Sequence, residues 1–209
     1  MWAPPSPEVR QLQALVRRRD DLRRMAAADK TRLDAPDLTP AARRSLARTV
    51  RFLAKEADRV QAQAEAIIAA TPELAADLAL LESVKGVGRQ TATTVLAELP
   101  PVDQLPSAES AAAYSGLAPA EFTSGKSVRK YTRLSKAGNA RLRTALYLPT
   151  LTAIRFNPVL KAFYDRLIAA GKPKMQAVGA CMRKLVMICY GVLKNRKPFD
   201  PDWASRIAT

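Results

Sequence analysis

Histidine is absent from the 209 residues of this chain, and its absence excludes several kinds of active site. Neither a Ser-His-Asp triad nor a Cys-His pair can be built without an imidazole, and zinc sites that need a histidine ligand are excluded with them. Cysteine is scarce, since only Cys181 and Cys189 occur, in a segment that we predict to be helical. Eight residues of helix separate them by about 12 Å, too far for a mutual disulfide. Free thiols and an N-terminus unlike a signal peptide predict a cytoplasmic protein.

Long hydrophobic runs are missing as well, and acidic residues are in deficit. The longest apolar run, 185–193, is too short to span a bilayer, so we expect no membrane association. Against 19 Asp and Glu stand 34 Lys and Arg, which gives a formal net charge of +15. So large an excess predicts a polyanionic partner. Ribosomal and membrane-surface proteins can be equally basic, so charge alone does not identify the partner.

What the chain does contain predicts a mainly α fold. Hydrophobic residues make up 48% of the sequence, which is enough for a core. Helix starts are predicted at Ser6-Pro7, Thr39-Pro40 and Thr71-Pro72, where a hydroxyl caps the helix and proline takes its first position. No strand-like alternation extends beyond a few residues. Further helices are expected at 74–84, 91–99, 108–114, 139–155, 157–170 and 173–195, with an irregular basic segment at 116–138.

Residues 1–72 are predicted to form a coiled helical arm. A heptad-like apolar seam runs through Leu46, Val50, Leu53, Ala57, Val60, Ala64 and Ile67. The preceding helix offers an apolar face, and residues 34–39 make the turn between the two. Two interpretations are about equally supported: an antiparallel hairpin closed within one chain, or an arm through which the protein forms a homo-oligomer. The seam is short and contains alanine, so it would be a weak zipper by itself.

A glycine-containing turn at 85–89 resembles the helix-hairpin-helix motif of DNA-binding proteins. Gly86 and Gly88 permit a tight turn that brings backbone N–H groups at a helix N-terminus against a phosphate, while Lys85 and Arg89 add positive charge. Such contacts position a duplex without reading its sequence. The alternative is a connector between helices with no ligand.

The stretch from 122 to 164 contains no acidic residue, and this is the strongest electrostatic signal in the sequence. Phosphates would relieve the repulsion among its cations by releasing counterions, whereas the alternative is a solvated charged face. The aromatic residues Tyr114, Phe122 and Tyr131 can stack on bases, although core positions are more common for them. The cations are Lys126, Arg129, Lys130, Arg133, Lys136, Arg141, Arg143, Arg155 and Lys161.

Serine hydroxyls within this stretch are candidate nucleophiles. A serine can attack a phosphodiester if neighbouring cations stabilise the developing charge and another group accepts its proton. On chemical grounds alone Ser124, Ser127 and Ser135 are nearly equivalent, and a turn or cap role is the simpler interpretation of each.

The order of these segments is similar to the IS-one-ten family of insertion-sequence transposases, relatives of the Piv-type DNA invertases. The resemblance covers about residues 75 to 198. The similar blocks are SVKGVGRQTA (83–92), AYSGLAP (113–119), TSGK (123–126), RLSKAGNARLR (133–143) and NPVLKAFY (157–164).

The resemblance implies an enzyme with an N-terminal RuvC-like domain that binds magnesium through Asp and Glu, a helical arm, and a C-terminal transposase domain. The serine nucleophile of the family falls on Ser124, and some members are guided by an RNA that the element encodes. The implied partners are DNA and such a guide RNA, and the helical arm adds the expectation of a second copy of the chain. The expected nucleic-acid contacts are Lys85, Gly86, Gly88, Arg89, Lys126, Arg129, Lys130, Arg133, Lys136, Arg141 and Arg143.

The chain departs from the family pattern in two ways. Ala120 and Ala137 stand where many relatives carry a basic residue. No RuvC-like segment or cluster of acids is present, so we expect no metal site in this chain, with Mg²⁺ held elsewhere, and a truncated or split form of the enzyme.

We therefore predict a helical arm at 1–72 followed by a helical transposase domain with a helix-hairpin-helix motif at 73–209, acting in transposition and recombination of DNA through Ser124. The alternative is a non-enzymatic module that binds nucleic acid through the same residues. A ribosome-associated RNA-binding protein is a third interpretation.

Overall fold

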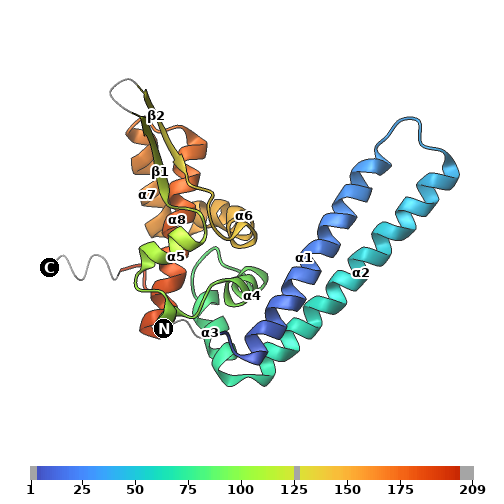
Figure 1. Cartoon of the computed structure of the whole chain (residues 1–209), viewed down its shortest axis with the longest axis horizontal. Coiled ribbons are helices and arrows are strands. Elements are labelled where there is room, and N and C mark those ends of the chain that lie inside the picture. Colours follow the sequence, from blue (N-terminus) through green and yellow to red (C-terminus); the bar gives the residue numbers. More distant parts are fainter. Residues whose placement is uncertain (1–3, 125–127, 203–209) are drawn as a thin grey trace. The chain divides into compact units, whose positions relative to one another are not determined.

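A computed structural model describes residues 4–124 and 128–202, and within 121–132 it describes no side chains. The chain divides into two compact units, Ser6–Ala75 and Ala76–Thr209, the latter joined by the first five residues. The mainly α prediction is confirmed. The described elements are α1 (Pro7–Leu33), α2 (Pro40–Ala70), α3 (Pro72–Glu82), α4 (Arg89–Glu98), a 3₁₀ turn η1 (Val102–Gln104), α5 (Ala108–Tyr114), β1 (Pro119–Ser124), β2 (Val128–Leu134), α6 (Ala140–Phe156), α7 (Pro158–Ala169) and α8 (Lys174–Asn195) (Figure 1).

The starts of α1 and α2 follow the local capping signals, whereas the predicted cap at Thr71 is wrong, because Thr71 Oγ1 donates to the carbonyl oxygen of Ile67 at 2.9 Å. Ser6 Oγ accepts a hydrogen bond from the N–H of Val9 at 3.3 Å, and Thr39 Oγ1 accepts one from Ala42 at 3.3 Å. In each case proline occupies the first helical position, where its missing N–H is no loss. The two helices are joined by residues 34–39, as the sequence predicts.

The helices α1 and α2 form an antiparallel hairpin within one chain (Figure 1). Leu22 of α1 packs with Leu53, Ala57 and Val60 of α2 in a buried cluster. The prediction of Ile67 as the last seam position is wrong, because Ile68 takes the place after Ala64 and is only 1% exposed. Spacings of four residues follow the 3.6-residue turn of a nearly straight helix, whereas a strict heptad would need a three-residue step there. Association of two arms stays a prediction.

A buried arginine links the two helices of the hairpin, which no local sequence pattern predicted. The side chain of Arg19 is 2% exposed. Its Nη2 donates to Asp20 Oδ1 at 2.7 Å, and its Nη1 donates to Gln61 Oε1 of α2 at 2.7 Å. Gln61 in turn donates to Glu65 at 2.7 Å, which completes a polar network across the helix pair. Removing the guanidinium would leave the Gln61 carbonyl oxygen without its buried donor.

The centre of the second unit is α8, which packs against α5, α6 and α7. Tyr190 of α8 donates its hydroxyl to the carbonyl oxygen of Leu105 at 3.0 Å, which fixes the segment before α5. Both cysteines lie on this helix as buried free thiols. Burial raises the pKa of Cys181 to about 11 and that of Cys189 to about 12. By length and composition α8 resembles a membrane span, but its apolar face is largely buried in the core of this unit.

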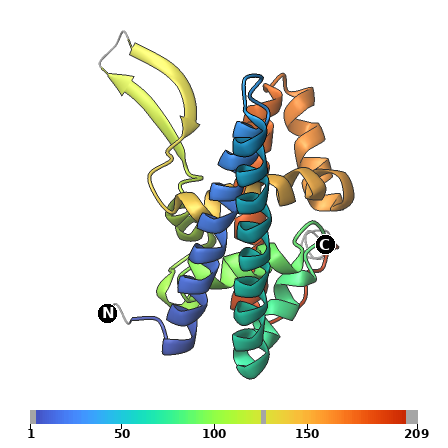
Figure 2. The same ribbon diagram turned by 90° about the vertical axis from the view of Figure 1, so that its right-hand side faces the viewer.

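The prediction of an irregular basic segment at 116–138 is wrong. The segment contains the β1–β2 hairpin, which extends outward from the helices of its unit (Figure 2). The strands pair antiparallel, with Pro119 opposite Leu134 and Ser124 opposite Val128, and a bulge lies between Ala120 and Phe122. β-branched and aromatic residues favour strands here, but interspersed cations hid their pattern. At the base, a Cβ built on Gly179 of α8 would lie 3.2 Å from Leu134, so this strand end packs closely on α8.

Replacement of Arg19 by alanine is expected to weaken the helical hairpin by about 1–3 kcal/mol, because it removes the buried partner of Gln61. Amide hydrogen exchange in α1 and α2 should therefore accelerate by about 5- to 150-fold. Arg18→Ala, at an exposed position of the same helix, is the matched control and should change the exchange rate little. Equal exchange in the two variants would contradict a stabilising role for the network.

Candidate nucleic-acid interface

The turn between α3 and α4 is fixed tightly against α6. Val84 and Val87 are buried, and the N–H of Val87 donates to the carbonyl oxygen of Val84 at 2.8 Å. Gly86 has a φ of +104°, and a Cβ built on it would lie 2.5 Å from the Cβ of Ala153 in α6. Asn157, after the end of α6, donates its side-chain amide to the carbonyl oxygen of Lys85 at 3.3 Å. Only glycine allows the backbone to approach α6 so closely.

The outer side of the same turn carries positive charge. Lys85 and Arg89 are exposed, and Arg89 lies 3.8 Å from the carboxylate of Glu82. Gly88 is the N-cap of α4 without a side-chain cap, and a Cβ built on it would meet nothing within 4 Å. The positive end of the α4 dipole therefore opens onto free space, which is the geometry needed for a phosphate.

The base of the β1–β2 hairpin is locked by backbone contacts between residues 114–118 and 135–139. Ser135 donates its N–H to the carbonyl oxygen of Ala118 at 2.9 Å, and Lys136 donates to that of Gly116 at 3.1 Å. Asn139 donates its N–H to the carbonyl oxygen of Tyr114 at 2.6 Å. A Cβ on Gly138 would collide with that same carbonyl oxygen, so the two loops lie against each other with no room for a side chain.

Two polar side chains of this region act inside the protein. Arg143 Nη1 donates to the carbonyl oxygens of Ser115 and Lys136, each at 3.2 Å, and so joins the two loops. Asn139 caps α6 by accepting from Leu142 at 3.0 Å, and its amide donates at 2.7 Å to the carboxylate of Glu98, which is 1% exposed. The sequence did not predict the Glu98–Asn139 contact, because the partners lie 41 positions apart. The N-cap preference of asparagine was its only local signal.

The helix α6 connects the glycine turn at 85–89 with the base of the β1–β2 hairpin. Ala153 and Asn157 at its C-terminal end hold the glycine turn, and Asn139 and Arg143 at its N-terminal end hold the hairpin base. About 13 residues of helix separate these contacts, which corresponds to about 20 Å. Along B-DNA this is about six base pairs at 3.4 Å each.

The predicted site residues differ in how far the structure describes them. Arg133 and Lys136 are exposed at the hairpin base, whereas Arg141 is half-buried in the first turn of α6. For Ser124, Arg129 and Lys130 only the backbone is described: Ser124 ends β1, and the register pairs Thr123 with Arg129 and Phe122 with Lys130. Lys126 lies outside the described residues. Ser124 is therefore placed at the far end of the paired strands, at the tip of the hairpin.

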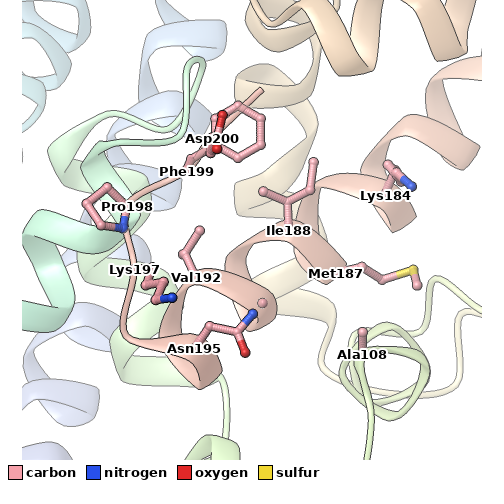
Figure 3. A pocket seen from close by; sticks show the side chains of 11 residues that line it. Ala108, Lys184, Met187, Ile188, Val192, Asn195, Lys197, Pro198, Phe199 and Asp200 are labelled. Carbon is pink, nitrogen blue, oxygen red and sulfur yellow. The ribbon is translucent and has the colours of Figure 1, made fainter. Parts of the chain in front are cut away.

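A cavity of this unit lies apart from the predicted site residues, and the described residues show no arrangement of acids or thiols for a metal ion. In the described part of the chain, no group of three or more Asp, Glu or Cys side chains is arranged to hold a metal ion. A cavity of about 950 Å³ lies between α8 and the residues that follow it (Figure 3). Ile188 and Val192 of α8 and Phe199 give it an apolar wall, while Lys184 and Lys197 lie at its margin. None of the predicted nucleic-acid contacts lines it.

A comparison with known proteins matches the part of the chain that contains the glycine turn and the β1–β2 hairpin. The family model "Transposase IS116/IS110/IS902 family" matches residues 78–165, which include the glycine turn, the β1–β2 hairpin and α6. Residues 78–165 of this chain therefore match a transposase domain of the IS116/IS110/IS902 family. The resemblance to the IS-one-ten family is thereby confirmed.

The relatives of this chain include gene-inverting and insertion-element proteins. The chain is 30% identical over 201 residues to the pilin gene-inverting protein of Moraxella bovis, and the alignment covers 96% of this chain and 62% of the relative. The protein of the same name from Moraxella lacunata matches equally well. An IS110 insertion-element protein of 43.6 kDa from Streptomyces coelicolor is 28% identical over 151 residues, 72% of this chain and 36% of its own length. The chain thus spans less than two thirds of each of these relatives.

Replacing Gly86 by alanine is expected to destabilise the transposase domain by about 2–4 kcal/mol, because the added Cβ is strained at positive φ and overlaps Ala153. Gly88→Ser is the matched control, since serine is a favourable N-cap and the space beside Gly88 is open. Thermal unfolding should shift to lower temperature for Gly86→Ala alone. Similar melting of both variants would show that the turn does not depend on its contact with α6.

Proposed function

We propose that this chain binds DNA and takes part in DNA strand exchange, as a transposase or invertase, with Ser124 as the nucleophile. The observation that carries the proposal is the arrangement within residues 78–165, where one helix, α6, holds the glycine turn at one end and the base of the basic hairpin at the other. The family match supports DNA recombination as the general activity. The serine chemistry and the individual contacts are our inference.

The glycine turn and the hairpin are proposed to contact the phosphates of one DNA duplex at two separate places. The turn would act as a helix-hairpin-helix motif, in which N–H groups at the start of α4 donate to a phosphate and Lys85 adds its charge. Arg133 and Lys136 would contact phosphates from the base of the hairpin. A separation of about 20 Å along α6 suits phosphates about six base pairs apart. Arg143 would contribute by holding the hairpin base.

Ser124 is proposed to act at the tip of the hairpin. Its Oγ forms a bond to phosphorus while the bond from phosphorus to one sugar oxygen breaks, and the released sugar oxygen takes up a proton. The serine proton passes to a general base supplied by the assembled complex. Cations of the hairpin stabilise the charge that develops on the phosphate oxygens. The divalent cation that the family resemblance implies would be held by carboxylates of another domain or chain, because the described residues offer no such cluster.

Further partners belong to the same proposal. An element-encoded guide RNA and a second copy of the chain associated through the helical arm would complete the recombining complex, and we expect it to act in the cytoplasm. The alternative function is a non-enzymatic nucleic-acid-binding module, favoured by the fact that the turn and the exposed cations would bind a backbone without any chemistry at Ser124.

Covalent trapping tests the role of Ser124. In the presence of a complementing RuvC-like domain, wild type is expected to attach to a nicked DNA substrate, and Ser124→Ala is expected to lose at least 100-fold of this product. Ser135→Ala, which removes a second hydroxyl of the basic segment, is the control and should still react. Denaturing gel electrophoresis of labelled DNA measures the product. If Ser124→Ala attaches DNA as readily as wild type, the nucleophile is assigned wrongly and the binding module is favoured.

The salt dependence of DNA binding tests the interface. Substituting Lys85, Arg133 and Lys136 by glutamine should lower the slope of log affinity against log salt by about 2.7, since each phosphate contact contributes about 0.9. Lys172, Lys174 and Lys184, all exposed on the same unit, provide a control in which the same charge is removed. Fluorescence anisotropy at several salt concentrations measures both. Equal slopes in the two triple variants would indicate that binding follows net charge and not this interface.

A further inference from the structure

The first half of α2, in the helical arm, carries a concentration of positive charge. These cations lie outside the residues of the transposase domain to which we assign DNA binding. No acidic residue occurs between Asp37 and Glu56, and the first turn of α2 contains none. The cations in this interval are Arg43, Arg44, Arg48, Arg51 and Lys55.

Four of these cations lie on one face of the helix. Arg44, Arg48, Arg51 and Lys55 follow one another at spacings of four, three and four residues, and all are exposed. At 3.6 residues per turn they fall within about 60° of one another, along about 16 Å of the helix. The same geometry puts them opposite the buried seam of Leu53, Ala57 and Val60 that packs on α1. We call this set the arm stripe.

The arm stripe consists of exposed cations without acidic partners, in contrast to several other cations of the arm. Arg44, Arg48 and Lys55 have no carboxylate within ion-pair distance among the described residues, and Arg51 Nε donates only to the carbonyl oxygen of Ala47, at 3.2 Å. Several other cations of the arm are paired with acids. These pairs are Arg23–Asp58 at 4.0 Å, Arg24–Asp21 at 3.3 Å, Arg32–Asp29 at 2.5 Å and Arg59–Glu56 at 3.6 Å.

Such an arrangement works against the stability of α2. Like charges three or four residues apart destabilise a helix. An anion bound along the stripe would reverse this effect. Phe52, 64% exposed, lies at the edge of the stripe between Arg48 and Lys55 and adds an apolar surface that can pack against a ligand.

We propose that the arm stripe is a second binding site for duplex DNA, separate from the turn and hairpin of the transposase domain. A second copy of the chain meeting this face would bring like charges together, so the occupant is a polyanion. Four charges over about 16 Å match the phosphates of about five base pairs. The choice of DNA rests on the proposed function, in which DNA is the substrate of the transposase domain. The arm would therefore bind DNA flanking the site of strand exchange.

The test compares two quadruple variants of the full chain that remove the same charge from the same unit. The stripe variant is Arg44→Gln, Arg48→Gln, Arg51→Gln and Lys55→Gln. The matched control is Arg23→Gln, Arg24→Gln, Arg32→Gln and Arg59→Gln, which removes cations paired with acids. Affinity for a 40-base-pair and a 12-base-pair duplex is measured by fluorescence anisotropy across a range of salt concentrations, and circular dichroism checks the helix content of both variants.

With the long duplex, the stripe variant is expected to lose about 3.6 from the salt slope, and the control variant less than about 1. With the short duplex, which one site can occupy alone, the two variants should differ little. Equal slopes for both variants on the long duplex would overturn the inference while leaving the proposed function intact. Failure of wild type to bind any duplex would instead overturn the proposed function.

Two further outcomes would also overturn the inference. If the stripe variant lost affinity for an RNA duplex of 40 base pairs and kept its affinity for the DNA, the occupant would be RNA. If sedimentation showed that the stripe variant, but not the control, changed the oligomeric state without changing DNA affinity, the face would be an interface between copies of the chain.

Discussion

The contact between the Gly86 turn and Ala153 of α6 is the constraint on which the arrangement of the transposase domain depends. It brings two backbone segments, 67 positions apart in the chain, closer than any side chain at Gly86 would allow. Because Asn157 reinforces the same contact and Asn139 holds the other end of α6, the helix acts as a rigid spacer. The glycine turn and the hairpin base are thereby kept at a fixed separation, as a binding surface requires before its ligand arrives.

The cations of this protein differ in whether the described structure shows an acceptor or a carboxylate beside them. Where cations support the fold, they have defined acceptors: Arg19 donates to Asp20 and Gln61, and Arg143 donates to two carbonyl oxygens. Some exposed cations, among them Lys85, Lys136 and Arg48, have no carboxylate beside them in the described structure. They lie on the surfaces to which we assign nucleic acid, in a protein with a net charge of +15.

The sequence predicted those features of the fold that depend on neighbouring residues. Helix starts at Ser6 and Thr39 follow from caps that act within three positions, and the Gly86 turn follows from a local motif. The β1–β2 hairpin was missed because its cations interrupt the alternation that predicts strands. Buried polar contacts such as Arg19–Gln61 and Glu98–Asn139 join residues about 40 positions apart, so no local pattern contains them. For the candidate interface, the turn and Ser124 came from motifs, whereas the connecting role of α6 required the structure.

The burial of both cysteines in α8 has a practical consequence for anyone who wishes to follow this protein spectroscopically. Burial raises the thiol pKa values to about 11 and 12, so Cys181 and Cys189 are protonated at neutral pH and are expected to react slowly with alkylating dyes. A cysteine introduced on an exposed face of α2 would be the most reactive thiol of the native protein. Fluorophores can thus be attached there while the native cysteines stay in place.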